Sequence, residues 1–385
     1  MSKQLKTPLY ALHQELGGNM MPFAGYAMPV QYPTGIKAEH KHTRAKAGLF
    51  DVSHMGQVLL SGDSFQVVAS AFEALVPMDV LGLGEGRQRY GLFTNDQGGI
   101  EDDLMFANRG DHLFVVVNAA CKDADIARMK QALEPAVTVT SITDRALLAL
   151  QGPAAEAVLA SIVPAAADMR FMDVATSDAD GVTLWVSRSG YTGKDRYEIS
   201  VPADAAEGLA LRLLGHPDVL PIGLGARDSL RLEGGLCLYG LDIDSETLPY
   251  EAGLGWAIQK ARCTDGVRAG GFPGAEAIYV QRANGPTRRR VGLQPQGRAP
   301  MREGEVLFAD AEGGAPIGVI TSGGFGPTTG GAVAMGYVFA ELANAGTELF
   351  GELRGKRVPV TIPSLPFVAA NFKRQSNDKL MGIKT

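Results

Sequence analysis

Cysteine is scarce in this sequence, and long apolar runs are missing. The 385 residues include three cysteines, which lie far apart and are odd in number. This pattern argues against a disulfide framework and against a cysteine-rich zinc site. No apolar run approaches the roughly 20 residues that a membrane span needs. The opening MSKQLKTPLY has no apolar core of the kind that a signal peptide requires. We therefore expect a cytoplasmic protein that has no membrane partner.

An excess of positive charge is also missing. The 36 lysines and arginines are outnumbered by 42 acidic residues, which gives a formal net charge of −6. A chain without a basic field is a poor partner for nucleic acid or for a membrane surface. Hydrophobic residues make up 45% of the chain and charged residues 20%, as in ordinary globular proteins. At this length, the totals predict two or three globular domains.

The nucleotide-binding motifs in the sequence are incomplete. Residues 188–195 end in Gly-Lys-Asp, where a P-loop needs Ser or Thr after the lysine, and they begin with Arg where that loop needs Gly. The glycines of residues 82–86 and 223–225 lack the third glycine at the step that a dinucleotide fingerprint requires. A nucleotide-binding fold therefore has little support, and the 48 glycines instead indicate many tight turns.

Residues 52–138 have the pattern of one compact α+β unit. A strand begins at Gln57, and the apolar stripe from Phe65 to Leu75 predicts a helix after it. A hairpin follows, with a turn over residues 95–99 whose Asn, Asp and Gly suit positive φ. A further strand ends at Asn118, and apolar residues spaced as on one helix face come after it.

The remainder of the chain predicts two other domains. Residues 1–51 open with a helix capped by Thr7, and we expect them to pack with residues 139–261 in a first α+β domain. Residues 285–375 contain short β runs separated by Gly, Pro and Asn, a spacing that predicts a small barrel or sandwich. The stretch from Arg262 to Pro286, rich in Gly, Arg and Ala, is interpreted as a connector.

Two groups of charged or metal-ligating residues have ordinary structural interpretations. Glu39, His40 and His42 could ligate a metal, but two alternating histidines without further ligands at the usual spacing are more often a polar edge. The run Arg288–Arg290 opens a predicted strand in an acidic protein, so we expect a solvated strand end.

Two groups of carboxylates are stronger candidates for chemistry. Asp102 and Asp103 are neighbours on a predicted strand, so one can face solvent while the other faces a cleft. A buried acid is rare without a partner, which leaves a functional and a structural role open for this pair. Residues 188–198 form a glycine-bearing turn between two strands and leave Glu198 early in the second strand. By itself, that segment is a hairpin with a structural or solvated acid.

Taken together, these segments resemble the aminomethyltransferase, or T-protein, family of the glycine cleavage system. The matching text includes TPLY-LH-ELGGNMMPFAGY, EH-HTRAKAGLFDVSHMGQ, GGIEDDL, VVNAA, RSGYTG, ARDSLRLEGGLCLYG, TSGGFGPTTGG-VAMGYV and the final LPF-V-AN. It runs from Thr7 to about Phe372. The resemblance implies a three-domain α+β fold that binds folate in a central channel and has a C-terminal β-barrel.

The resemblance also implies roles for single residues. Asp103 matches the family's essential carboxylate near the reactive end of folate, and Asp102 ranks second because relatives that act on other substrates keep an acid only at the later position. A carboxylate such as Glu198 can accept the ring N–H and the exocyclic amine of a pterin together. The residues on the family's folate-contact positions are Tyr90, Asn118, Tyr191, Glu198 and Arg227.

The implied reaction joins tetrahydrofolate, as co-substrate, to an aminomethyl group held on the lipoyl arm of a carrier (H) protein. Folate N5 attacks the aminomethyl carbon as ammonia leaves, and Asp103 orients the folate amines and stabilises the developing positive charge. Other implied possibilities are a folate-dependent demethylase on the same scaffold and a folate-binding regulator without transfer activity. The sequence lacks the K-G-C-Y-x-G-Q-E segment of those regulators.

Three positions depart from the family's pattern. Lys194 and Arg196 stand where Glu and Gly are usual after GYTG, and Phe372 stands where a tyrosine contact is common. The first two change the charge of a turn more than contacts with a ring. Phe372 lacks one hydroxyl hydrogen bond, worth roughly 1 kcal/mol.

Overall fold

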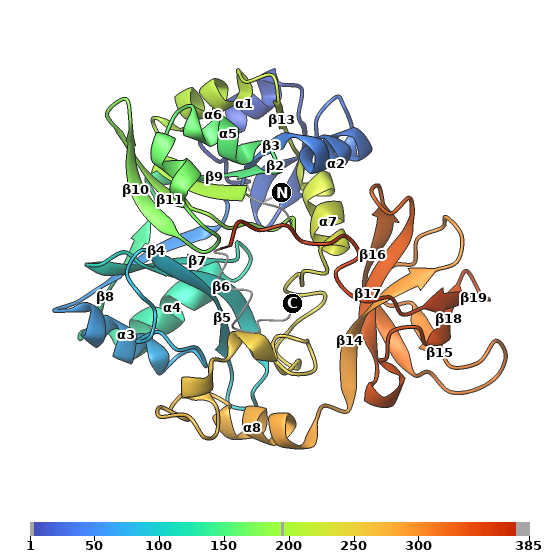
Figure 1. Cartoon of the computed structure of the whole chain (residues 1–385). Coiled ribbons are helices and arrows are strands. Elements are labelled where there is room, and N and C mark those ends of the chain that lie inside the picture. Colours follow the sequence, from blue (N-terminus) through green and yellow to red (C-terminus); the bar gives the residue numbers. More distant parts are fainter. Residues whose placement is uncertain (1–3, 194–195, 375–385) are drawn as a thin grey trace.

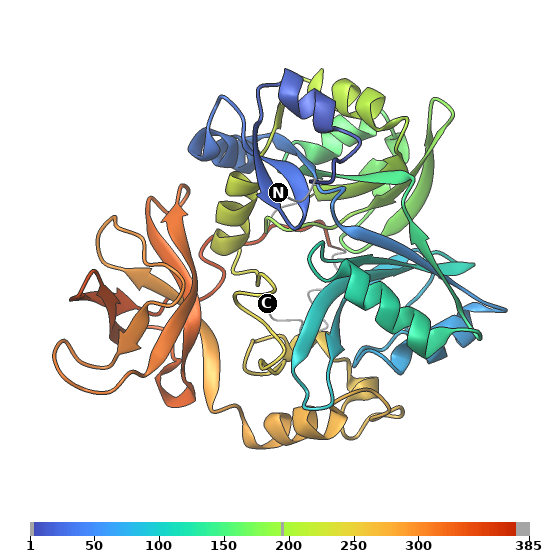
Figure 2. The same cartoon turned by 180° about the vertical axis from the view of Figure 1, so that it is seen from behind.

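The computed structural model describes residues 4–193 and 196–374. Figures 1 and 2 show three sheet-bearing bodies arranged around a common centre, with the C-terminal barrel, orange to red, on one side. In the described part of the chain, no helix is long and apolar enough to cross a membrane. All three cysteines are free thiols.

The first body is a six-stranded sheet in the order β10-β11-β12-β9-β3-β13, in which only the β3–β13 pair is parallel. Its strands are β3 (Ala47–Asp51), β9 (Arg145–Gln151), β10 (Val174–Ala179), β11 (Val182–Ser187), β12 (Arg196–Pro202) and β13 (Val219–Pro221). Its helices are α1 (Tyr10–Glu15), α2 (Ile36–Ala45), α5 (Ala155–Ala160), α6 (Ala206–Leu214) and α7 (Leu224–Glu233). The hairpin β1 (Asn19–Phe23) and β2 (Tyr26–Gln31) lies beside this sheet.

Strand β9 shows why this sheet is hard to predict from the sequence pattern. Leu148 and Leu150 pack with α5 and α6 on one face, and Leu147 packs with residues of α7 on the other. A strand that is buried on both faces has a continuous apolar run without alternation, so the sequence pattern predicts neither β9 nor β3. The first helix also differs from expectation: it begins at Tyr10, and the Thr7 side chain does not cap it.

The second body is a five-stranded antiparallel sheet in the order β5-β6-β7-β4-β8. Its strands are β4 (Gly56–Ser61), β5 (Arg87–Thr94), β6 (Ile100–Asn108), β7 (His112–Val117) and β8 (Thr138–Ile142), and its helices are α3 (Phe65–Glu73) and α4 (Lys122–Leu133). The predicted hairpin is confirmed, and Gly98 in its turn has a φ of 84°.

Two segments depart from the predicted domain boundaries. Strand β8 pairs along β4, so residues 139–142 belong to the second sheet and not to the first, because the chain returns from α4 to that sheet's open edge. The loops between Cys237 and Cys263 also bury apolar side chains in the core of the second sheet. The predicted connector contains the helix α8 (Ala275–Asn284), of which only Ile278 is buried. The division into three domains stays a prediction.

The third body is a closed six-stranded barrel in the order β14-β17-β16-β15-β18-β19. Its strands are β14 (Arg288–Pro295), β15 (Val306–Phe308), β16 (Gly318–Gly326), β17 (Gly331–Phe339), β18 (Glu348–Leu353) and β19 (Lys356–Thr361). Its core is filled by apolar side chains such as Leu293, Met301 and Leu349. The predicted α+β class with a C-terminal β-barrel is confirmed.

The chain after the barrel returns to the first sheet, as the dark red trace in Figure 1 shows. The amide of Val368 donates to the carbonyl of Glu233 at 3.1 Å, and the amide of Asn371 donates to the carbonyl of Gly193 at 3.3 Å. This C-terminal segment therefore connects the barrel to α7 and to the turn between β11 and β12.

Candidate active site

The two carboxylates of β6 lie at the centre of the candidate site. The strand alternates, so Asp102 is fully buried while Asp103 on the opposite face keeps some exposed surface. Asn118, just after β7, joins them: its side-chain amide lies 2.8 Å from Asp102 Oδ1 and 2.8 Å from Asp103 Oδ1, and its backbone amide donates to Asp102 Oδ2 at 3.1 Å. The structure thus brings three of the predicted residues, counting Asp102, into one hydrogen-bonded group.

Tyr90, on the neighbouring strand β5, adds a hydroxyl to this group. Burial, followed by the charge of Asp103, raises the pKa of Tyr90 well above its usual value, so this phenol stays protonated. Burial and the charge of Asp102 raise the pKa of Asp103 to about 7, although hydrogen bonds from Tyr90 and Asn118 oppose the rise. A carboxyl with a pKa near neutrality can hold or release a proton under ordinary conditions.

A second group of predicted residues comes from the first sheet and α7. Glu198 on β12 accepts a hydrogen bond from the Ser189 hydroxyl at 3.0 Å. The guanidinium of Arg227 on α7 lies 4.9 Å from the centre of the Tyr191 ring. Burial lowers the pKa of Arg227, and the charge of Glu198 opposes this effect. The buried Nη1 atom of Arg227 has no hydrogen-bond partner among the described residues, so it is available to a ligand oxygen.

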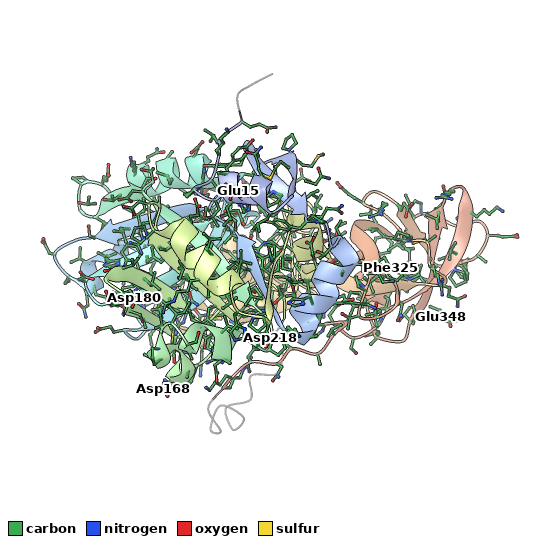
Figure 3. All side chains as sticks on the ribbon, turned by 90° about the horizontal axis from the view of Figure 1, so that it is seen from above. Glu15, Asp168, Asp180, Asp218, Phe325 and Glu348 are labelled. Carbon is green, nitrogen blue, oxygen red and sulfur yellow. The ribbon has the colours of Figure 1, made fainter. Side chains whose placement is uncertain are left out.

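Tyr191 and Cys237 connect the two groups. The hydroxyl of Tyr191 donates a hydrogen bond to the carbonyl of Cys237. Cys237 is buried in the same apolar cluster against which Tyr90 packs. The predicted contact residues from both sheets therefore face one another. By contrast, Figure 3 shows Asp168 and Asp180 at the outer surface.

Sequence reasoning missed two residues of this site. Ser189 lies inside the quoted RSGYTG segment, but its hydroxyl bond to Glu198 depends on the strand pairing. Trp256 lies on a short 3-10 helix (Gly255–Ala257), is 64% exposed, and stacks on Tyr90 with ring centres 5.5 Å apart. It is one of only two tryptophans in the chain, and that scarcity is the one signal that could have drawn attention to it.

The expected polar edge around Glu39 and His40 is wrong, because both side chains are fully buried on α2. Glu39 accepts from the amides of Tyr32 and Gly223 at 2.6 and 2.8 Å, and His40 contacts Glu233 at 3.0 Å. These contacts tie α2 to α7, which gives the residues a structural role.

The expected solvated strand end at Arg288–Arg290 is also wrong for two of its three residues. Arg288 donates to Glu251 at 3.0 Å, and Arg290 donates to the carbonyls of Gly235 and Ala252 at 3.0 and 2.8 Å. Only Arg289 is exposed. The first and third arginines of the strand therefore join the barrel to the loops that follow α7.

The departures from the family's pattern lie at the edge of the site. Phe372 stacks on Phe171, with ring centres 4.2 Å apart, and the guanidinium of Arg196 lies 5.0 Å from its ring. These contacts belong to the C-terminal segment rather than to the group around Asp103. Lys194 lies outside the described residues.

Comparison with known proteins gives a consistent result along the whole chain. Residues 9–262 match the family described as the GCVT N-terminal domain, and residues 288–369 match the glycine cleavage T-protein C-terminal barrel domain. The chain is 42% identical to the mitochondrial aminomethyltransferase of Dictyostelium discoideum, with 96% of this chain and 94% of the relative covered. It is also 42% identical to the aminomethyltransferase of a Synechococcus strain, with 96% and 99% covered.

A solved structure agrees with these sequence matches. The crystal structure of glycine cleavage system aminomethyltransferase T from Bartonella henselae is 43% identical to this chain and superposes with a TM-score of 0.89. The alignment covers 97% of this chain and all of that chain. The similarity therefore extends through all three sheets and is not confined to one segment.

Proposed function

The chain belongs to the aminomethyltransferase, or T-protein, family of the glycine cleavage system, and from this premise we propose that it moves a methylene unit from a lipoyl carrier protein to tetrahydrofolate. In the balanced reaction, the aminomethyl carbon leaves the lipoyl sulfur and bonds to two folate nitrogens, and the amine departs as ammonia. The two protons that these nitrogens give up go to the ammonia and to the sulfur, which becomes a thiol. The protein is thus an enzyme, an aminomethyltransferase.

The second group of site residues suits the pterin end of folate. The carboxylate of Glu198 can accept two adjacent N–H donors of the ring, and the Ser189 hydroxyl steadies that carboxylate from the side. The unpartnered Nη1 of Arg227 supplies a buried donor for a ring oxygen. A buried donor without a partner costs about 1–3 kcal/mol, so a ligand that satisfies it gains affinity.

Asp103 is the residue that we assign to the chemistry. The single observation that carries the proposal is the placement of Asp103, a partly exposed carboxyl held by the Asn118 amide at 2.8 Å on the strand that also carries the buried Asp102. Burial raises its pKa to about 7, in which range a carboxyl can accept a proton from a folate amine and then release it. As a carboxylate, it also stabilises positive charge that develops on the transferred carbon. Tyr90 and Asn118 hold the carboxylate in place through hydrogen bonds.

The partners of the reaction follow from the same assignment. We propose a lipoyl carrier (H) protein as the donor of the aminomethyl group and tetrahydrofolate as the acceptor. We also propose a cytoplasmic location, consistent with three free thiols. Some eukaryotic relatives are named mitochondrial, whereas the Synechococcus relative is not.

The test uses the purified protein with a carrier protein that has been loaded with aminomethyl groups. We expect rapid ammonia release only when tetrahydrofolate is present, together with the appearance of free carrier thiol. A protein that binds folate but releases no ammonia would be a regulator and not a transferase. Demethylation of a methylamine or sulfonium substrate at a higher rate would instead indicate another enzyme on this scaffold.

A further inference from the structure

A third acid lies beneath the two carboxylates of β6. Asp125 is in the first turn of α4, one turn after Cys121, and is only 3% exposed. A turn connects Asn118 to helix α4, and in this turn the amide of Cys121 donates to the carbonyl of Asn118 at 3.1 Å. The turn places Asp125 on the buried side of β6. The helix therefore adds a buried acid to the pair that Asn118 already holds.

The hydrogen bonds of Asp102 and Asp125 are unequal. Both oxygens of Asp102 accept hydrogen bonds from Asn118. The buried Oδ2 atom of Asp125 accepts none from the residues that the structure describes. An ionised carboxylate needs donors when it is buried, whereas a protonated carboxyl can itself donate. The charge is therefore better placed on Asp102 and the proton on Asp125.

We propose that Asp125 is a positioning residue of the site: it holds a proton at neutral pH and donates it to Asp102 as a hydrogen bond. Asp102, Asp103 and Asp125 form what we call the acid cluster. With this proton in place, Asp103 has one ionised neighbour beneath it instead of two. The proton on Asp125 thus limits the negative charge beneath Asp103, and this charge influences the pKa of Asp103.

The titration behaviour of the cluster agrees with this arrangement. Burial raises the pKa of Asp125, and its contact with Asp102 raises it further. Burial also raises the pKa of Asp102, but the hydrogen bonds from Asp125 and Asn118 lower it. Two carboxylates in contact cannot both ionise without a large penalty, so one of them keeps a proton.

In the part of the chain that the structure describes, the thiols and phenols next to the acid cluster are neutral. Cys121 adjoins Asp102, and burial with the charge of Asp102 raises the pKa of that thiol to about 12, so it stays neutral. Tyr239, from the loop after α7, is a neutral phenol for the same reasons, with a pKa raised to about 12. Tyr90, Tyr191 and Cys237 face Asp103 and carry no charge at neutral pH. Among the described residues, no group of three or more metal-ligating side chains is placed to hold a metal.

The first experiment locates the proton without using activity. The full-length protein is labelled at the aspartate carboxyl carbons and titrated by 13C NMR between pH 6 and 8.5. We expect Asp103 to titrate near pH 7 and one further carboxyl to stay protonated through neutrality, and we expect the signal of this second carboxyl to be lost in Asp125→Asn. The exposed Asp123 on the same helix provides the control, because Asp123→Asn leaves the signal in place. A wild-type protein without such a carboxyl, or a signal that survives in Asp125→Asn, overturns the proposal.

The second experiment follows Asp103 itself. Asparagine at position 125 keeps a neutral donor to Asp102, so we expect the NMR pKa of Asp103 to move by less than about 0.3 unit in Asp125→Asn. Asp102→Asn removes the charge beside Asp103, so its pKa should fall by about one unit. If Asp125 is ionised in the wild type, Asp125→Asn also lowers the pKa of Asp103 by about that amount, and the proposal is wrong.

The inference rests on the proposed function only for the catalytic role that this function gives to Asp103. If the protein released no ammonia from a loaded carrier, the transferase assignment would fail while the NMR titration could still find the proton on Asp125. Conversely, an active enzyme whose Asp125 is ionised retains the proposed function and refutes the positioning role. The two results are therefore independent.

Discussion

The acid cluster and the carboxylate of Glu233 are both buried, yet their surroundings are opposite. Glu233, at the end of α7, contacts the His40 ring at 3.0 Å and the Arg44 guanidinium at 3.1 Å, and it accepts the amide of Thr328 at 2.8 Å. Burial alone would raise the pKa of Glu233, but these contacts outweigh it and hold the pKa at about 2. The pKa of Asp103 is instead raised to about 7.

The difference shows how one chain uses buried charge in two ways. The contacts of Glu233 join α2, α7 and the β16–β17 turn of the barrel, so its compensated charge holds parts of the fold together. In the acid cluster, by contrast, Asp125 Oδ2 has no hydrogen-bond partner among the described residues, and the neighbouring thiol and phenols are neutral. Such an arrangement lowers stability and leaves a carboxyl ready to exchange a proton, as expected of a catalytic site.

The largest effect on stability should come from removing Glu233, whose buried charge has several hydrogen-bond donors around it. Glu233→Ala removes the buried carboxylate that the His40 ring and the Arg44 guanidinium both contact, and we expect a loss of about 3–5 kcal/mol in the free energy of unfolding at pH 7. Urea denaturation measures this loss. The exposed Glu207 on α6 is the control, because Glu207→Ala should change stability little. Equal stability of the two variants would show that the Glu233 contacts are not a structural junction.

The pKa shift of Glu233 also fixes the pH range of its contribution. The pKa is lowered from 4.5 to about 2, so the stabilisation is complete above about pH 4.5 and disappears as the pH falls through about 2. The difference in stability between the wild type and Glu233→Ala should therefore be large at pH 7 and small near pH 2.

The second effect, on transfer activity, should appear in Asp103→Asn, which changes the acid cluster. We expect transfer to fall about 100-fold or more, because a positioned charge near the reacting carbon is lost. Folate binding should persist. Ammonia release from a loaded carrier, together with calorimetry of folate binding, measures both properties. Activity within a few-fold of the wild type would end the assignment, and Asp102→Asn, tested beside it, shows which carboxylate carries the reaction.

The same variant should become more stable above neutrality, in contrast to Glu233→Ala. The pKa of Asp103 is raised from 3.8 to about 7, so its favourable contribution is present below pH 3.8 and is lost as the pH rises through about 7. At pH 8, asparagine removes an ionised group that the fold tolerates poorly. A melting temperature lower than that of the wild type at pH 8 would contradict this account.

Part of the fold could be predicted from the sequence because some elements carry a clear period or a clear turn. Strand β6 alternates between buried and partly exposed residues over its first half. The barrel strands, such as β17, were predicted as short β runs separated by Gly, Pro and Asn. Helix α2 was missed because its buried side chains include Glu39 and His40, so it has no apolar stripe. Helix α8 was missed because it buries a single residue, and β9 because both of its faces are covered.

The candidate site was predictable only where a motif marks it. Asp103, Asn118, Tyr191 and Arg227 lie in segments that resemble the family, and the structure brings them together from two sheets and a helix. Asp125 has no such signal, since an acid in the first turn of a helix usually serves the helix dipole. Its role depends on the distance between α4 and β6, which the sequence does not contain.

The third effect concerns Glu198, the carboxylate that we propose binds the pterin. Glu198→Gln replaces an acceptor-only carboxylate by an amide, so we expect folate binding to weaken by about 1.5–3 kcal/mol while the rate of the bound state changes less. Calorimetry gives the dissociation constant, and single-turnover ammonia release gives the rate. An unchanged dissociation constant counts against a contact between Glu198 and folate, and Glu207→Gln is the matched control.

The fourth effect is the pH dependence of transfer. In the proposed reaction, Asp103 acts as a carboxylate, and its pKa is raised to about 7. The rate with saturating substrates should therefore rise about tenfold per pH unit up to about pH 7 and then level off. Asp103→Asn should lose this rise. A flat wild-type profile between pH 5.5 and 8.5 would mean that Asp103 does not titrate in the bound state.

The smallest effect should come from a change at Phe372, which tests whether this side chain contacts folate. A tyrosine is common at this position in the family, and a hydroxyl that reached folate would tighten binding by about 0.5–1.5 kcal/mol. In this structure, however, the ring lies against Phe171 at 4.2 Å and beneath Arg196, in the C-terminal segment. We therefore expect Phe372→Tyr to change folate affinity by less than about 0.5 kcal/mol.

Calorimetry of folate binding distinguishes two possible positions of the residue 372 ring in the Phe372→Tyr variant. If the ring stays on Phe171, calorimetry finds an unchanged dissociation constant with an unchanged melting temperature. If folate draws the ring toward Glu198 and Arg227, the dissociation constant falls about twofold to tenfold, as about 0.5–1.5 kcal/mol requires. Weaker binding at an unchanged melting temperature would show that the ring contacts folate at a place without a partner for a hydroxyl, because a buried, unpaired hydroxyl is unfavourable.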